Sequence, residues 1–303
     1  MHARRNALLL LHLTVFIWGF TGILGKLIQQ GTLHLVYTRT VIAAVGLGFA
    51  AVWMKRSISL RAPGLINYLL TGLLIAAHWI TFYGAIKIST ASIAAACLST
   101  STVFTALLEP FWFKRRIRVY EVVLGTVVIA ALLLIFGIES EYRLGIAVGV
   151  LSAFLSAWFN IINAVLVQRD NVVRIGFYEM ASVALVMGVG LWVVGDLPPP
   201  LWELPTSDII YHLILGLVCT SFSFVTGILV MRQLSPFTVM LTVNLEPVYT
   251  ILIALLIWGE EERLSLGSYL GIALILGCLL LNGWFQKRRE RTGLVEPDPL
   301  GRG

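Results

Sequence analysis

The stretch FTVMLTVNLEPVYTILIALLIW at residues 237–258 decides the fold class. It holds about 22 residues, and the one charged side chain among them is Glu246. A helix needs about 20 apolar residues to cross the hydrocarbon core of a bilayer. Backbone groups in lipid must also find their hydrogen-bond partners within the chain, which a helix provides. The stretch therefore predicts a membrane-spanning helix.

The same pattern recurs along the whole chain. Ten apolar windows, each bounded by charge, proline or glycine, lie at about 6–27, 35–54, 65–86, 91–113, 119–137, 144–167, 175–194, 209–231, 237–258 and 266–285. They are too long and too continuously apolar for barrel strands of about ten alternating residues. We expect an all-α integral membrane protein with ten transmembrane helices.

The overall composition agrees with this class. Of the 303 residues, 58% are hydrophobic and 13% are charged, whereas a soluble domain carries about 25% charged residues. This excludes a soluble enzyme, a disordered chain and a coiled coil. Three cysteines lie far apart in apolar windows, so neither a disulfide framework nor a metal site is expected. We expect no cofactor.

Lysine and arginine give the orientation, because they gather in cytoplasmic loops. With ten helices and the N-terminus inside, 17 of the 22 fall inside, 4 fall outside, and Arg39 lies within the second window. Both termini are therefore expected in the cytoplasm, with the protein in the inner or plasma membrane. The net charge of +6 sits in these loops, so it indicates topology and no nucleic-acid partner.

The chain also contains an internal repeat. Val103-Phe104-Thr105 corresponds to Val248-Tyr249-Thr250 at an offset of 145, and Trp18 corresponds to Trp158 at an offset of 140. We expect two five-helix repeats, at 1–137 and 143–286, followed by a basic, disordered cytoplasmic tail at 287–303.

Because five is odd, the second repeat must be inverted relative to the first. The equivalent charged turns agree, since KRRIR at 114–118 falls inside and EEER at 260–263 falls outside. Inverted repeats are typical of secondary transporters, which bind substrate near the bilayer midplane between the two repeats.

The sequence resembles the EamA-like group of ten-helix permeases in the drug/metabolite transporter superfamily, over about residues 6–286. The resemblance rests on five features: Trp18-Gly19, Arg39, Tyr83–Ser89, NLEPVYTILIALLIWGEEERLS at 244–265 and the Gly271–Gly277 glycines. The KRRIR turn departs from the acidic turn of many members. The resemblance implies transport of a small metabolite by alternating access, with export as the favoured direction.

Glu246 is the first candidate for a substrate or coupling site. It lies near the middle of its window beside Asn244 and Pro247. The proline cannot donate to the carbonyl of Val243, which leaves that oxygen free and favours a kink. An ionisable residue in a span is a functional candidate by default. Glu246 is expected to bind a proton or a cationic group; the alternative is a structural carboxyl bonded across helices.

Other polar and aromatic residues within the windows are weaker candidates. Ser101 is the repeat mate of Glu246, and His78, Trp79 and Tyr83 share the third window. Plausible cavity residues are Trp18, Trp158, Asn160, Asn163 and Tyr249. Each has an alternative in ordinary helix packing.

Three charged residues near helix ends are expected to act structurally or electrostatically. Arg39 and Glu179 occupy matching positions at an offset of 140, and each either reaches the membrane surface or anchors its helix to neighbours. Arg39 has a further role open to it, the attraction of an anionic substrate. Glu109 is expected to pair with the basic cluster that begins at Lys114.

The predicted function is secondary active transport of a small metabolite across the lipid bilayer. Coupling of this transport to protons is left open by the sequence. Three other classes stay open: a small-solute channel, a membrane receptor or scaffold, and an intramembrane enzyme. The enzyme is disfavoured because the chain has no HExxH, GxSxG or complete P-loop. The cargo and the oligomeric state are not specified by the sequence.

Overall fold

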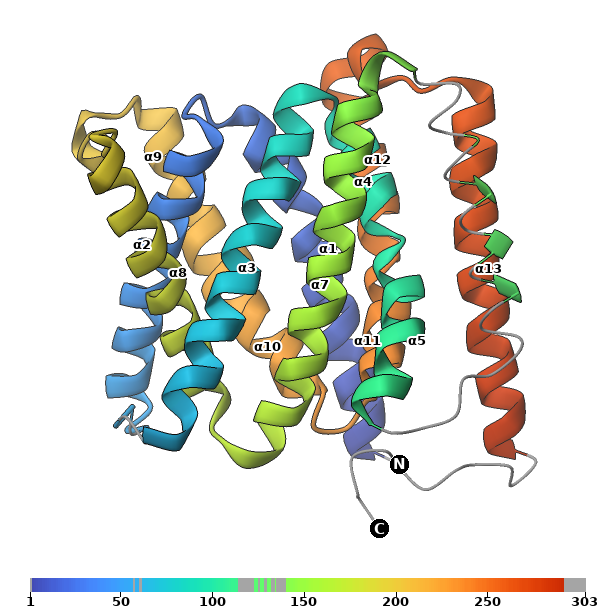
Figure 1. The fold of residues 1–303 in the computed structure, drawn as a ribbon, viewed down its shortest axis with the longest axis horizontal. Helices are drawn as coiled ribbons and strands as arrows, with labels where there is room; N and C mark the ends of the chain where they lie inside the picture. The colour runs from blue at the N-terminus through green and yellow to red at the C-terminus, as the bar shows by residue number, and fades with distance from the viewer. Residues whose placement is uncertain are drawn as a thin grey trace.

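The computed structural model describes residues 2–56, 58, 59, 62–113, 123, 124, 126, 127, 130, 131, 134 and 140–291. Within these ranges every regular element is helical (Figure 1). The basic cluster at 114–118, most of the window at 119–137 and the tail from residue 292 lie outside the described residues.

Five helices precede residue 114. They are α1 (His2–Leu27), α2 (Thr32–Trp53), α3 (Ala62–Ile88), α4 (Ala91–Leu98) and α5 (Ser101–Trp112). The start of α4 is fixed by Thr90, whose hydroxyl accepts a hydrogen bond from the amide of Ile93 at 3.1 Å. Such a cap satisfies one of the amides that a helix leaves unpaired at its start.

The second part of the chain repeats this arrangement. Its elements are η1 (Ser140–Tyr142), α7 (Arg143–Arg169), α8 (Val172–Val194), η2 (Leu201–Glu203), α9 (Thr206–Leu213), η3 (Ile214–Phe222), α10 (Ser223–Val230), α11 (Pro236–Val243), α12 (Leu245–Trp258), η4 (Gly259–Glu262) and α13 (Leu266–Arg291). The segment η3 is a π-helix, a wider winding that is rare in proteins and occurs frequently at functional sites. The start of α11 is capped by the hydroxyl of Ser235, which corresponds to Thr90 before α4.

Eight helical spans in the described part of the chain are long and apolar enough to cross a membrane. The pairs α4–α5 and α11–α12 and the series α9–η3–α10 contribute one span each. In α13 the apolar stretch Leu266–Cys278 is shorter. The prediction of an all-helical, membrane-spanning fold is confirmed, while the number of ten helices stays a prediction.

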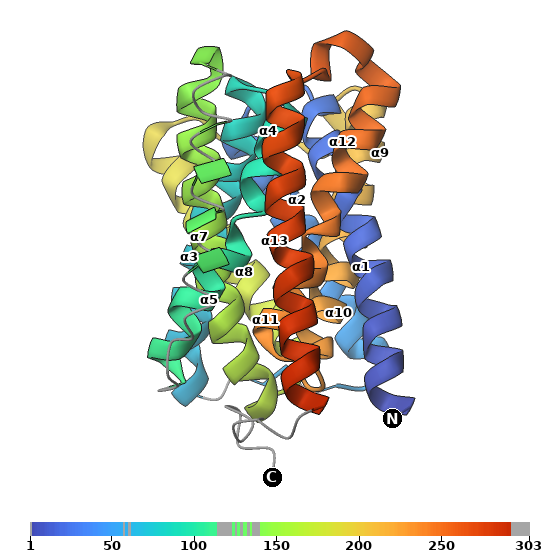
Figure 2. The ribbon, with the colours of Figure 1, turned by 90° about the vertical axis from the view of Figure 1, so that its right-hand side faces the viewer.

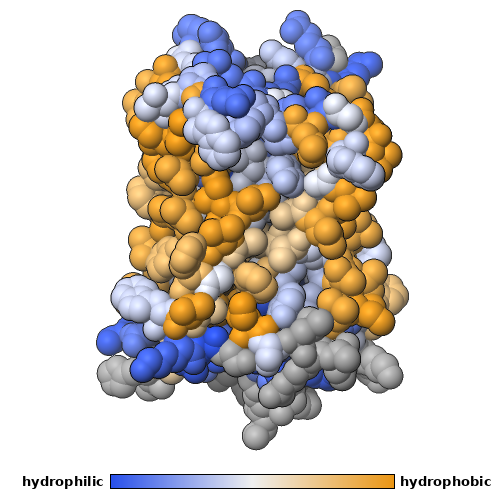
Figure 3. All heavy atoms as spheres, turned by 90° about the vertical axis from the view of Figure 1, so that its left-hand side faces the viewer, coloured by the Kyte–Doolittle hydropathy of each residue, from blue (hydrophilic) through white to orange (hydrophobic). Residues whose placement is uncertain are grey.

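The surface matches a bilayer environment. Figure 3 shows hydrophobic residues in a band across the middle of one face, with hydrophilic residues at both ends. Large apolar side chains are strongly exposed around the bundle, among them Phe49, Trp192 and Leu256. In water such a surface would aggregate, whereas lipid tails cover it at no cost.

Helices from the two parts of the chain pack against one another. The pairs α3 with α7, α2 with α8 and α1 with α12 form large contacts (Figures 1 and 2). Small residues permit the close approach of α7. A Cβ added at Gly145 would lie 2.6 Å from Cβ of Ser89, and one at Gly149 would lie 2.8 Å from Cβ of Cys97. Close packing of this kind holds helices together where lipid gives no hydrophobic drive.

The helices run between two ends of the bundle, which we call the N-terminal face and the opposite face. Helix α1 starts at the N-terminal face, while α7 starts at the opposite face (Figure 1). Lys26, near the end of α1, therefore lies at the opposite face, and Asp170, after the end of α7, lies at the N-terminal face.

Candidate functional site

Two of the spans are interrupted near their middle. Helix α4 ends at Leu98 and α5 begins at Ser101, and α11 and α12 are likewise separated at Asn244. Pro247 lies in the first turn of α12, where a proline removes no intrahelical hydrogen bond. Each interruption places a helix start, with its partial positive charge, inside the bundle.

The two interruptions are joined directly. The amide nitrogen Nδ2 of Asn244 donates to Oγ1 of Thr102 at 2.6 Å, and that hydroxyl donates to the carbonyl of Met240 at 3.1 Å. The predicted kink at Glu246-Pro247 is thus one of two matching breaks. The second break coincides with the polar residues at 99–102, and the sequence analysis did not predict a helix interruption there.

A cavity of about 70 Å³ lies beside these breaks. It has room for on the order of five water molecules or a small solute group. Helices from both parts of the chain line it through Trp18, Thr21, Arg39, His78, Trp79, Phe82, Leu98, Ser156, Phe159, Asn160, Cys219, Phe224, Gly227, Ile228, Met240, Val243 and Glu246. We call it the central cavity.

Glu246 supplies a carboxylate to the central cavity. It stands in the first turn of α12 and is 7% exposed. No described residue forms a hydrogen bond with its side-chain oxygens. The helix start favours the negative charge, so the carboxylate is held in place and left open to a ligand.

Arg39 supplies the opposite charge. Its Nε and Nη2 donate to Oγ1 of Thr220 at 3.1 and 2.6 Å, and Nη1 donates to the hydroxyl of Tyr83. The guanidinium also lies 4.1 Å from the ring centroid of Trp79, a cation–π contact. The side chain is 1% exposed, so Arg39 anchors α2 to α3 and η3 and does not reach the membrane surface.

The two charges share the cavity without closing on each other. Among the described residues, no carboxylate lies within 4.0 Å of the Arg39 guanidinium. Arg39 and Glu246 nevertheless interact electrostatically across the cavity. A separated pair of this kind can bind the two ends of a solute that carries both charges.

The remaining wall of the central cavity is aromatic. The rings of Trp79 and Phe224 have centroids 6.3 Å apart, and Phe159 lies 6.3 Å from Phe224. His78 is 5.4 Å from Phe159, and its Nδ1 lies 2.8 Å from the hydroxyl and 2.9 Å from the carbonyl oxygen of Ser152. These contacts fix the ring of His78 at the cavity wall.

The structure brings six predicted site residues together around the central cavity, namely Trp18, Arg39, His78, Trp79, Asn160 and Glu246. Tyr83 and Asn244 lie directly behind it and position Arg39 and the break in α11–α12. Asn163 lies outside the lining and bonds Glu179.

Other predicted residues lie away from the cavity. Trp158 is 36% exposed and packs edge-on against Phe154. Tyr249 packs against Phe16 and beside Gly19. Ser101 is buried at the start of α5 and is absent from the lining. Whether such a side chain faces the cavity depends on the rotation of its helix about its own axis, which composition does not specify.

The two remaining candidates, Glu109 and Glu179, are buried carboxyls. Glu109 is 3% exposed, and its expected partner Lys114 lies outside the described residues. Glu179 is fully buried and therefore does not reach the membrane surface. Sequence analysis missed Thr220 and Cys219, because nothing in the pattern signals the π-helical winding that turns them toward Arg39 and the cavity.

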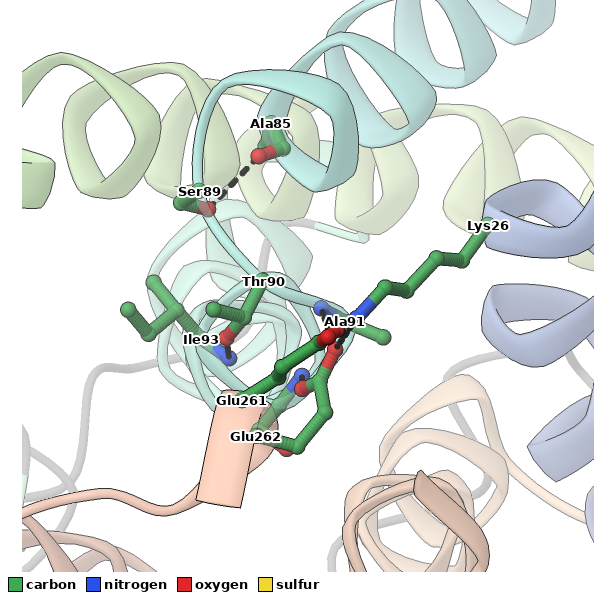
Figure 4. A network of polar contacts seen from close by, with 9 residues as sticks. Lys26, Ala85, Ser89, Thr90, Ala91, Ile93, Glu261 and Glu262 are labelled. Carbon is green, nitrogen blue, oxygen red and sulfur yellow. Dashed lines mark hydrogen bonds and ion pairs between the residues drawn. The ribbon is translucent and has the colours of Figure 1, made fainter. Parts of the chain in front are cut away.

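A polar cluster, which we call the latch, joins helix ends at the opposite face of the bundle (Figure 4). Nζ of Lys26 lies 2.9 Å from Oε1 of the fully buried Glu262. The same carboxylate accepts hydrogen bonds from the amides of Ala91 and Ser92, at 3.2 and 2.9 Å. Lys26 also lies 4.3 Å from the ring centroid of Trp258. The latch joins α12 and η4 to the end of α1 and the start of α4.

A central cavity between two sets of interrupted helices is the arrangement found in secondary transporters. The sequence profile of the EamA-like transporter family matches this chain twice, at residues 5–137 and 143–284. The chain belongs to the EamA-like transporter family. It is thus a multi-pass membrane protein of a transporter family, with the lipid bilayer and a small-molecule substrate as its partners.

Two further comparisons were made. A search of curated proteins found no match. A solved structure, described only as the crystal structure of a protein, aligns with a TM-score of 0.70 at 16% identity, over 94% of this chain and 99% of its own. At that identity the likeness concerns the fold alone.

Proposed function

We propose that this protein is a secondary active transporter that moves a small zwitterionic metabolite through the central cavity by alternating access. The observation that carries this proposal is the placement of Arg39 and Glu246 in one cavity without an ion pair between them. A carboxylate on the solute would bind the guanidinium, an ammonium would bind Glu246, and the aromatic wall would cover the apolar part.

Alternating access follows from inverted repeats at 1–137 and 143–286, which rock against each other about the cavity. The opposite directions of α1 and α7 support this arrangement (Figure 1). So do the matching breaks in α4–α5 and α11–α12. The latch of Lys26 and Glu262 joins the two repeats at the opposite face, and breaking it would open that face of the cavity.

Coupling is assigned to Glu246. When the ammonium of the solute leaves, the carboxylate stands alone in a site with little water, where an uncompensated charge is costly. A proton from water then binds to an oxygen of Glu246, and it returns to water when the next solute arrives. Each cycle exchanges one proton for one zwitterionic solute molecule. With both termini in the cytoplasm, an inward proton gradient would then drive export of the solute.

The test uses purified protein in proteoliposomes and a radiolabelled mixture of the proteinogenic amino acids as the probe. Glu246→Gln keeps the shape of the side chain and removes the exchangeable proton. We expect the variant to fold normally and to lose accumulation driven by a pH gradient. Glu203→Gln, at an exposed carboxylate in η2, is the matched control and should behave as wild type. Unchanged accumulation by Glu246→Gln would refute the coupling role.

A further inference from the structure

A second buried carboxyl lies outside the central cavity, on α8. Glu179 is 0% exposed. Its Oε2 accepts one long hydrogen bond, from Nδ2 of Asn163 at 3.4 Å. Its other oxygen, Oε1, and Oδ1 of Asn163 have no hydrogen-bond partner within the described chain. This hydrogen-bonded pair of side chains thus holds two buried acceptors without a donor, and a proton on the Glu179 carboxyl would add a donor to the pair.

Within the described part of the chain, no cation acts on Glu179. Helix α3 contributes Tyr68, which interacts electrostatically with Glu179, and α7 contributes the neutral Asn163. On α8 itself Arg174 pairs with Asp170 at 2.6 Å, one turn and more toward the N-terminal face. The described parts of α2 and α10, which also pack on α8, bring no charged group that acts on Glu179. An ionised carboxylate there would be buried without a partner, which is strongly unfavourable.

Helix α7 connects this carboxyl to the central cavity. Ser152, Ser156, Asn160 and Asn163 follow one another at helical spacing and share one buried face. Ser156 and Asn160 line the cavity, and Asn163 is one turn nearer the N-terminal face. The polar face thus runs from the cavity to Glu179.

The same carboxyl is close to the N-terminal face on its other side. The hydroxyl of Tyr68 donates to Asp170 directly after the end of α7. The side chain of Asp170 is 16% exposed, so part of it is open to water at this face. Glu179 therefore sits between the central cavity and a polar cluster at the surface, and buried carboxyls in such places in membrane proteins serve as proton relays.

We propose that Glu179 and Asn163 form a second proton-binding site, separate from Glu246, which exchanges its proton with water at the N-terminal face. The O–H bond of the Glu179 carboxyl breaks, the proton passes to water beside Tyr68 and Asp170, and the carboxylate later takes a proton back from water. The site rests on the proposed transport function for its role in a cycle, but its protonation does not depend on the solute.

Infrared spectroscopy of the purified full-length protein tests this site without a substrate. We expect an absorption band of a protonated carboxyl that is lost in Glu179→Gln, stays in Glu246→Gln and disappears reversibly as the pH is raised. Asn163→Ala should shift the band to higher frequency, because the carboxyl loses its hydrogen bond. Glutamine keeps the neutral shape of the acid, so Glu179→Gln should fold.

Three results would overturn the proposal. They are a band that Glu179→Gln does not remove, a band that stays constant over the whole pH range in which the protein is folded, and a band that sodium ions abolish, which would indicate a sodium site. Failure of the transport proposal is distinguishable, because it appears as absent solute exchange while this band still titrates.

Discussion

Lys26→Met tests whether the latch at the opposite face controls access to the central cavity. Methionine keeps the apolar stem and removes the ammonium that lies 2.9 Å from the buried Glu262. The change should open this face more often, because the latch contributes the charged contacts that join the ends of α1 and α12 to the start of α4.

The size of the effect follows from the contacts that are lost. A hydrogen bond to a charged group contributes about 1.5–3 kcal/mol. The cation–π contact with Trp258 adds about 0.5–1 kcal/mol, and the exposed pair with Glu261 adds about 0–1 kcal/mol. Glu262 keeps its two amide donors from Ala91 and Ser92, so the variant avoids the full cost of an orphaned charge. If the closed state of this face loses about 2 kcal/mol of stability, the equilibrium constant for opening the face rises about 30-fold.

A native cysteine reports the opening. Cys219 lines the central cavity and is buried in this conformation. With Cys97 and Cys278 replaced by alanine, a membrane-impermeant maleimide applied to the face that carries Lys26 should label Cys219 about 30-fold faster in the Lys26→Met variant. The matched control is Arg263→Gln, directly after Glu262 at the same face, where the pair with Glu260 is exposed and contributes little. Equal labelling rates in wild type and Lys26→Met would refute the reasoning.

Three further predictions concern the cavity and the breaks. Arg39→Lys keeps the positive charge but loses the planar guanidinium, and the folded variant should show a KM for a solute carboxylate that is raised by about 10-fold or more in radiolabelled counterflow; an unchanged KM would contradict carboxylate binding. In Gly227→Ala the new Cβ would lie 2.7 Å from the ring of Trp18, so counterflow of bulky solutes should fall more than counterflow of glycine. An equal fall for solutes of all sizes would contradict a cavity wall formed by these two residues. Asn244→Ala removes the hydrogen bond between the two helix interruptions and should lower the unfolding temperature in detergent by about 2–4 °C, for a loss of about 1 kcal/mol of stability. Thr242→Ala removes a hydroxyl that bonds within its own helix and should lower that temperature less. Equal shifts would contradict a stabilising bond between the two interruptions.

The class of fold follows from the sequence because lipid imposes a simple rule. Apolar windows of about 20 residues must become helices, and the described spans begin and end within a few residues of the expected windows. The breaks are harder to anticipate. The interruptions fall at Ser99–Thr100 and at Asn244, which in the sequence are only polar residues inside apolar windows. The hydrogen bond of Asn244 with Thr102 depends on two spans meeting in three dimensions.

The residue types of the candidate site could be predicted from the sequence, whereas the directions in which their side chains point could be predicted less well. Glu246 and His78 were expected in the cavity and do line it. Trp158 and Asn160 were both expected there. Residues two positions apart on a helix point in directions about 200° apart, so these two side chains cannot both face the cavity. Packing of α7 on α3 turns Asn160 inward and Trp158 outward. Arg39 points inward because Tyr83, Trp79 and Thr220 together provide contacts for it.

Solute exchange with charge-deleted analogues tests the central claim most directly. Proteoliposomes containing the wild-type protein are loaded with an unlabelled aromatic amino acid, and uptake of the labelled amino acid is compared with that of its amide and of its deaminated acid. The amide lacks the anion for Arg39, and the acid lacks the cation for Glu246. We predict rapid exchange of the intact zwitterion and at least about 10-fold slower exchange of both analogues, since each loses one charge-assisted contact. Equal exchange of all three would contradict a cavity built to hold both charges.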